Sequence, residues 1–145
     1  MTSKREQVIS SFYNKLKTLE STNLKVYRNL DKPQKVPSAG MIVVRDGTSE
    51  EPEVLLNPLT YIYEHLITVE VMAQNADASL RDTQIDSLLA NIGSVINANR
   101  SLDGLAEWLE AKTPETTEEA IEGTSTIRTA SLQVMVRFFT NDPLN

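Results

Sequence analysis

Residues 61–72 alternate between two sets of side chains for about a dozen positions, and no other feature constrains the fold as strongly. Successive side chains on a β-strand point to opposite faces, so this alternation predicts a long strand. One face of that strand is apolar and carries Tyr61, Tyr63, His65, Ile67, Val69 and Val71. A strand of this length with one apolar face is predicted to lie at the centre of a sheet.

A second alternating stretch near the end of the chain predicts a C-terminal strand. Its apolar face carries Ala130, Leu132, Val134, Val136 and Phe138. Shorter apolar runs predict strands at residues 24–28 and 40–45. The Asp46-Gly47 dipeptide that follows favours a tight hairpin turn, and residues 46–60 are expected to form a long loop or a projecting hairpin.

Two amphipathic helices are predicted from apolar residues at helical spacing. Ser3 and Glu6 have the spacing of a capping box, which predicts that a helix begins there, and the pattern ends near Ser21. The apolar stripe of this helix contains Val8, Ile9, Phe12, Leu16 and Leu19. A second helix is predicted to run to Asn97, with an apolar stripe of Leu80, Ile85, Leu88, Leu89, Ile92, Val95 and Ile96.

The region between the second helix and the last strand has no regular pattern. Residues 102–109 fit either a short helical turn or an edge strand. Residues 110–126 are rich in threonine and glutamate and contain Pro114 and Gly123, so we expect an acidic, flexible segment with room for one short helix. Together the elements predict an α+β fold in a single domain over residues 1–145. Its mainly antiparallel sheet is expected to have about four to five strands, with two amphipathic helices packed on one face.

The composition excludes several kinds of chemistry. The chain has no cysteine and one histidine, His65, which removes disulfides, thiol catalysis and structural zinc sites. Glu64 and His65 are neighbours on a predicted strand, so their side chains point to opposite faces, and His65 is expected at the sheet surface. Because there is also no glycine-rich phosphate loop and no Gly-x-Ser-x-Gly motif, we expect no enzyme activity, no cofactor and no bound metal.

The sequence also constrains partners and location. A net charge of −6 argues against direct, sequence-specific binding of nucleic acid, which needs clustered cations. No apolar stretch approaches the roughly 20 residues that cross a bilayer, and the N-terminus lacks the apolar core of a secretory signal. We therefore expect no membrane association, and we expect the protein to be made and kept in a cytoplasm.

The charge is divided unevenly along the chain. Residues 1–45 contain nine basic and three acidic residues, a net charge of +6, whereas residues 46–145 contain five basic and seventeen acidic residues, a net charge of −12. Opposite charge on two regions favours contacts between different patches of neighbouring subunits. Lys15, Lys17 and Arg28 are the candidate interface cations, and a purely solvated surface is the alternative.

Phe139 is the candidate interface aromatic residue. Alternation places its side chain opposite to the face that carries Phe138, so its ring is expected on the outer surface, where aromatic side chains often anchor partners. Packing of the ring beneath a covering loop is the alternative.

The order of elements resembles that of the tail terminator (tail completion) proteins of long-tailed bacteriophages, prophages and gene-transfer particles. The resemblance covers nearly the whole chain, and its most telling pieces are Tyr27-Arg28 and the closing strand over residues 132–140. It implies a homo-oligomeric ring, a hexamer, that caps the tail tube, ends its polymerisation and forms the surface joined to the head–tail connector. Such a protein has no catalytic residues, has tail tube and connector proteins as partners, and resides in the virion tail after assembly in the bacterial host cytoplasm. The acidic residues 107–122 depart from the family pattern.

Two other interpretations fit the same order of elements. Another head–tail joining or adaptor protein of the same α+β shape would bind proteins without ending a tube. A double-stranded RNA-binding module has a similar order of helices and strands, but its basic residues would have to cluster near a C-terminal helix, where this chain is acidic.

Overall fold

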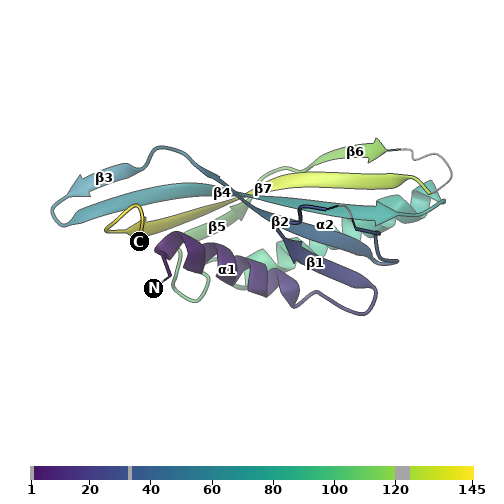
Figure 1. Ribbon diagram of the computed structural model, residues 1–145, viewed down its shortest axis with the longest axis horizontal. Coiled ribbons are helices and arrows are strands. Elements are labelled where there is room, and N and C mark those ends of the chain that lie inside the picture. Colours follow the sequence, from purple (N-terminus) through teal and green to yellow (C-terminus); the bar gives the residue numbers. More distant parts are fainter. Residues whose placement is uncertain (1, 33, 120–124) are drawn as a thin grey trace.

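A computed structural model describes residues 2–32, 34–119 and 125–145 of the chain (Figure 1). It contains two helices and seven strands, which confirms the α+β class. In chain order these are α1 (Lys4–Lys17), β1 (Leu24–Arg28), β2 (Gly40–Ser49), β3 (Glu53–Leu56), β4 (Leu59–Gln74), α2 (Ala78–Ala98), β5 (Trp108–Ala111), β6 (Glu115–Glu119) and β7 (Ile127–Thr140).

The seven strands form one sheet in which β4 is the central strand, as the alternation predicts. The order across the sheet is β1-β2-β4-β7-β5, while β3 pairs with the beginning of β4 and β6 pairs with β7. All pairs are antiparallel except β1 with β2. The expected four to five strands were too few, because β3, β5 and β6 have only four or five residues each, too short a span for alternation to reveal.

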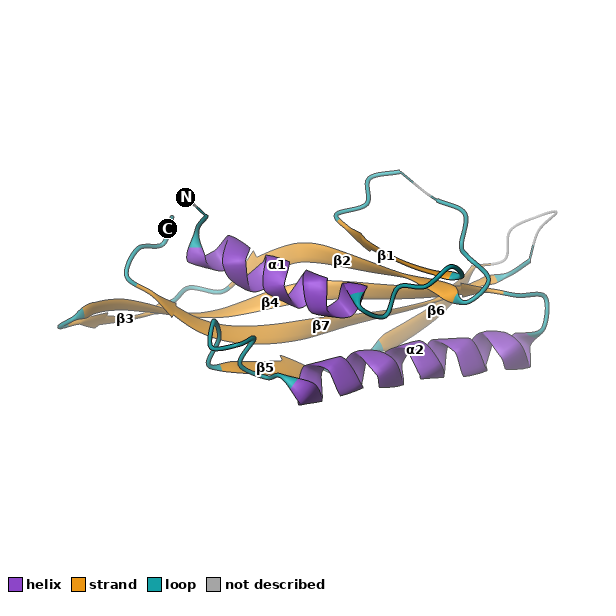
Figure 2. Cartoon of the chain, turned by 90° about the horizontal axis from the view of Figure 1, so that it is seen from below, coloured by secondary structure: helices purple, strands orange, loops and turns teal. Residues whose placement is uncertain are grey.

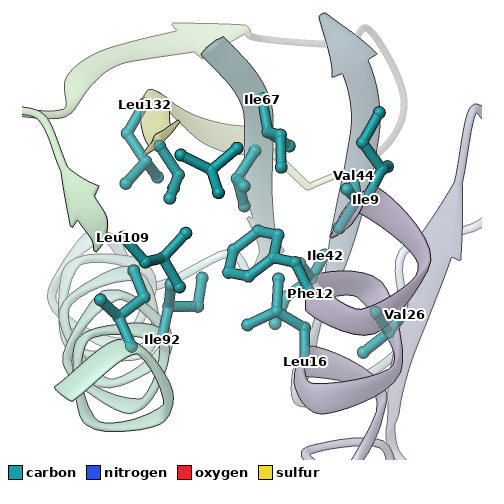
Figure 3. Close-up of a cluster of buried hydrophobic side chains, with 14 of the residues drawn as sticks. Ile9, Phe12, Leu16, Val26, Ile42, Val44, Ile67, Ile92, Leu109 and Leu132 are labelled. Atoms are coloured by element: carbon teal, nitrogen blue, oxygen red, sulfur yellow. The ribbon is translucent and has the colours of Figure 1, made fainter. Parts of the chain in front are cut away.

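Both helices pack on one face of this sheet, as predicted. In Figure 1 they lie below the sheet, and Figure 2 views the molecule from that side. Phe12 of α1 points toward the centre of the core, where it meets side chains from the sheet and from α2 (Figure 3). On the opposite face a smaller apolar cluster contains Val36, Met41 and Val43, so the sheet is buried on both sides at this end.

The helix termini follow from their capping residues. Ser3 caps α1, and its hydroxyl accepts a 3.2 Å hydrogen bond from the backbone N–H of Glu6. α1 ends at Lys17, one turn before the predicted end near Ser21. On α2 the predicted stripe is wrong at its first position: Leu80 is exposed and Arg81 is buried instead, where its guanidinium donates a 2.6 Å hydrogen bond to the carbonyl of Asn75.

The predicted hairpin turn at Asp46-Gly47 is wrong, because this dipeptide forms a β-bulge inside β2. The pairing of β2 with β4 shifts between Arg45 and Thr48, and the strand then continues to Ser49. Gly47 has a φ of 71°, a conformation that glycine adopts without steric cost. A dipeptide that suits a turn therefore suits a bulge for the same backbone reason.

The acidic region is also more regular than expected. Residues 108–111 and 115–119 are strands that pair with β7, so the short helix for which the sequence left room does not form in these two stretches. Of the two interpretations of residues 102–109, turns occupy the first part and an edge strand begins at Trp108. The flexible segment predicted over residues 110–126 falls partly on residues 120–124, which lie outside the described part of the chain.

Candidate interaction surface

The hairpin formed by β3 and the beginning of β4 carries a cluster of exposed apolar side chains. In Figure 1 it extends from the sheet at the end where β3 lies, beyond both helices. Leu56 is 81% exposed, and the other three large apolar residues are between 43% and 48% exposed. We call this cluster the apolar tip; it consists of Val54, Leu55, Leu56 and Leu59. Contiguous exposed apolar side chains on a water-facing hairpin are typical of binding surfaces.

The pairing register distributes the apolar tip over both faces of the hairpin. Residues directly opposite each other in an antiparallel pair share one face. Val54 pairs with Tyr61, and Leu56 pairs with Leu59, on the face that carries the helices elsewhere in the sheet. Leu55 pairs with Thr60 on the other face. A partner can therefore contact apolar side chains on either side of the hairpin.

Phe139 continues the outer face of this hairpin. It lies opposite Ile62 in the ladder between β4 and β7, and its side chain is 44% exposed. Phe138 points to the other face, is 1% exposed and stacks on Tyr63 with 5.5 Å between the ring centroids. The exposure predicted for Phe139 from alternation thus agrees with the structure, and its role at an interface stays a prediction.

Arg28 is bound inside its own chain. Its guanidinium donates two hydrogen bonds of 2.7 and 2.8 Å to the Glu6 carboxylate and a third of 2.9 Å to Asp46. The hydrogen bonds from Arg28 lower the pKa of Glu6 from 4.5 to about 2, and the same contacts raise the pKa of Arg28. Arg28 therefore ties the beginning of α1 to the end of β1 and to the bulge in β2.

Lys15 and Lys17 lie at the opposite end of α1 from Glu6. The Lys15 ammonium is 2.8 Å from the Asp103 carboxylate, a hydrogen bond that lowers the pKa of Asp103. The Lys17 ammonium lies 5.5 Å from the centre of the Tyr13 ring. The structure thus does not gather the three candidate cations into one patch.

Replacement of Arg28 by methionine should destabilise the fold in a pH-dependent way. Three charge-assisted hydrogen bonds are lost, but both carboxylates are partly exposed, so we expect a loss of about 1–2 kcal/mol near neutral pH. The pKa of Glu6 is lower in the folded state than in the unfolded state. Its stabilising contribution is therefore complete above pH 4.5 and is lost as the pH falls toward 2.

Urea unfolding across this pH range measures the effect. The difference in unfolding free energy between wild type and Arg28→Met should shrink as the pH falls. Lys15→Met is the matched control, because it removes a single exposed ion pair and should cost clearly less than Arg28→Met. A difference that is constant from pH 7 to pH 3 would contradict the assigned role of Glu6.

His65 is buried, not at the sheet surface as predicted. It is 3% exposed, its Nε2 hydrogen-bonds the backbone carbonyl of Asp46, and its Nδ1 lies 2.6 Å from the Ser49 hydroxyl. A carbonyl only accepts, so Nε2 carries the proton and Nδ1 accepts from Ser49. Burial lowers the pKa of His65. The bulge in β2 supplies the Asp46 carbonyl, and Ser49 lies opposite His65 in the regular ladder that follows the bulge.

The described residues hold no group of three or more histidine, cysteine, aspartate or glutamate side chains placed to bind a metal ion. Among the helices of the described part of the chain, none is both long enough and apolar enough to cross a membrane.

Sequence reasoning missed the apolar tip. The run Val54-Leu55-Leu56 between Pro52 and Pro58 was a visible signal, because three consecutive large apolar residues are unusual in a surface loop. The surrounding prolines and glutamates favour a loop, so the run was not interpreted as an exposed apolar surface.

No protein-family model matches the chain, and no curated protein matches it. Among solved structures, the chain is similar to one described as the virion of a native gene transfer agent (GTA) particle. The TM-score is 0.44 with 12% sequence identity, and the match covers 92% of this chain and 94% of that chain. Similarity at this level leaves the function to be argued from the chain's own residues.

Proposed function

We propose that this protein is a non-enzymatic assembly protein of a phage-like virion, which forms a ring on the tail tube. In this role it caps the tube, ends its polymerisation and provides the surface joined to the head–tail connector. The observation that carries the proposal is the apolar tip, because a projecting hairpin with four exposed large apolar side chains needs a protein surface to cover it.

Two further features support a ring of identical subunits. A cyclic ring is built from heterologous contacts, in which one patch of a subunit meets a different patch of the next. The charge of +6 in residues 1–45 and −12 in the rest favours that register over contacts between like patches. The order of elements resembles tail terminator proteins, which form hexamers and act in the virion tail after assembly in the host cytoplasm.

Measurement of the particle mass tests the proposal directly. Light scattering after size-exclusion chromatography should give a multiple of 16.2 kDa that corresponds to a hexamer, and negative-stain images should show rings. Rings added to polymerising tail tube protein should shorten the tubes. A defined monomer that binds tube or connector protein without changing tube length would instead identify a head–tail adaptor.

The ring should loosen as salt concentration rises. Opposite charges on exposed patches are screened, since the Debye length falls to about 3 Å at 1 M salt. Reversal of charge at Lys15→Glu/Lys17→Glu should shift the loss of the oligomer to lower salt. Lys112→Glu is the matched control, because Lys112 is exposed and lies outside the basic N-terminal region. An oligomer that is unaffected by salt and by Lys15→Glu/Lys17→Glu would mean that the uneven charge only keeps the surface solvated.

A further inference from the structure

The chain contains an apolar groove that is separate from the apolar tip. It is a cavity of about 430 Å³ between the connection after β1 and the sheet face that points away from the helices. We call it the outer groove; its apolar lining consists of Leu30, Val36, Met41, Val43, Met72 and Ile127. Its volume lies within the range of about 300–1,000 Å³ that is typical of binding pockets.

The outer groove and the apolar tip lie at opposite ends of the same strand. Leu59 begins β4 at the tip, and Met72 lies near the end of β4 in the groove. Thirteen residues at about 3.3 Å each separate them by about 43 Å. The apolar tip of a chain therefore cannot reach its own outer groove, whereas it is free to reach that of another copy.

The charges around the two features are complementary. Glu50, Glu51 and Glu53 lead into the apolar tip. Lys32 lines the outer groove, Lys35 precedes Val36 of its lining, and Lys25 pairs with Met41 in the ladder. Within the part of the chain that the structure describes, none of these three glutamates and three lysines forms an ion pair.

Two other charged residues line the outer groove without reversing this balance. Asp31 contributes one negative charge. Arg45 is already paired with Glu70, at 2.6 Å. The lysines near the groove thus still exceed the acids that face them, and they suit an acidic partner segment.

We infer that the apolar tip of one copy binds the outer groove of the next copy. The contact joins two different patches at opposite ends of the molecule, so it is head-to-tail, and it closes into a ring if the rotation between copies is a whole fraction of a turn. The inference rests on the proposed ring and names the surfaces that form it. Burial of the exposed leucines supplies the affinity, and the acidic and basic residues set the direction.

Disulfide trapping tests the contact, because the chain has no cysteine of its own. Leu56→Cys and Leu30→Cys variants are purified separately, mixed and oxidised. A disulfide requires Cα atoms within about 7 Å, so a covalent dimer of the two variants is expected only if tip and groove meet. The matched control replaces Leu56→Cys by Leu80→Cys, which places the thiol on another exposed leucine, at the beginning of α2, and should give no dimer.

A charge exchange tests the complementarity. Glu51→Lys/Glu53→Lys and Lys32→Glu/Lys35→Glu should each raise the dissociation constant between copies about tenfold or more, and a chain with all four changes should regain most of the affinity. Leu56→Asp should weaken the contact by a similar factor. The side chain of Leu56 is 81% exposed, so this variant keeps the fold.

The outcomes separate this inference from the proposed ring. Rings that form while the Leu56→Cys and Leu30→Cys variants give no disulfide, and that persist in Leu56→Asp, would overturn the inference and leave the proposed ring intact. The disulfide together with open chains instead of rings would support the contact and contradict the closed ring. A failure of the four-residue exchange to restore affinity would overturn the charge complementarity of the contact.

Discussion

Replacement of Gly47 by alanine is expected to destabilise the protein by about 3 kcal/mol or more. The φ of 71° at this position strains any residue with a Cβ atom. In addition, the new Cβ would lie 1.8 Å from the carbonyl oxygen of Leu66, a backbone atom that moves only if β4 moves. The bulge in β2 would have to rearrange, and the hydrogen bonds that hold the buried His65 ring would be disturbed with it.

Gly104→Ala is the matched control for this variant. Gly104 also has a positive φ, of 90°, but no atom beyond its two chain neighbours lies within 4 Å of a Cβ built there. Only backbone strain remains, and we expect a loss of about 1–2 kcal/mol. Chemical unfolding of both variants measures the difference. Equal losses would show that the close approach to Leu66 relaxes without cost.

The adjacent residues Phe138 and Phe139 should respond in opposite ways to truncation. Phe138→Ala removes a buried ring that stacks on Tyr63 and should cost about 3–5 kcal/mol. Phe139→Ser removes a ring on the outer face, so the melting temperature should stay within a few degrees of wild type. If Phe139 anchors a neighbouring subunit or the tube, its variant should instead lose the oligomer.

Thermal melts and light scattering on the same samples separate these effects. A large fall in the melting temperature of Phe139→Ser would place its ring in the core. Unchanged assembly together with unchanged stability would remove Phe139 from the interface and leave the apolar tip as the exposed apolar surface of the hairpin.

The sequence predicts the long elements of this fold because each repeats a pattern over many residues. Alternation covers about a dozen of the 16 residues of β4 and most of the 14 residues of β7, and α1 buries four apolar residues of its predicted stripe. The short strands β3, β5 and β6 are stabilised by pairing with these long neighbours. Such pairing is a tertiary effect, and local sequence does not report it.

Prediction of the site was partial for the same reason. Alternation identified Phe139 as exposed, because the face to which a side chain points is a local property of β7. The partners of Arg28 lie on α1 and β2, and only the folded chain brings Glu6 and Asp46 to it. Counting charges along the sequence therefore identified Arg28 as a cation, but it did not show that carboxylates of the same chain neutralise it.

The continuity of β4 has a mechanical consequence. A pull applied between the two ends of this strand acts along the strand axis, perpendicular to its hydrogen bonds with β7, which extend from Tyr61 to Gln74. Such a load is carried by the covalent backbone of β4, whereas a pull across the sheet would act directly on the hydrogen bonds between strands. If neighbouring copies bind opposite ends of β4, tension around the assembly acts along the strand, which is the direction in which the sheet is strongest.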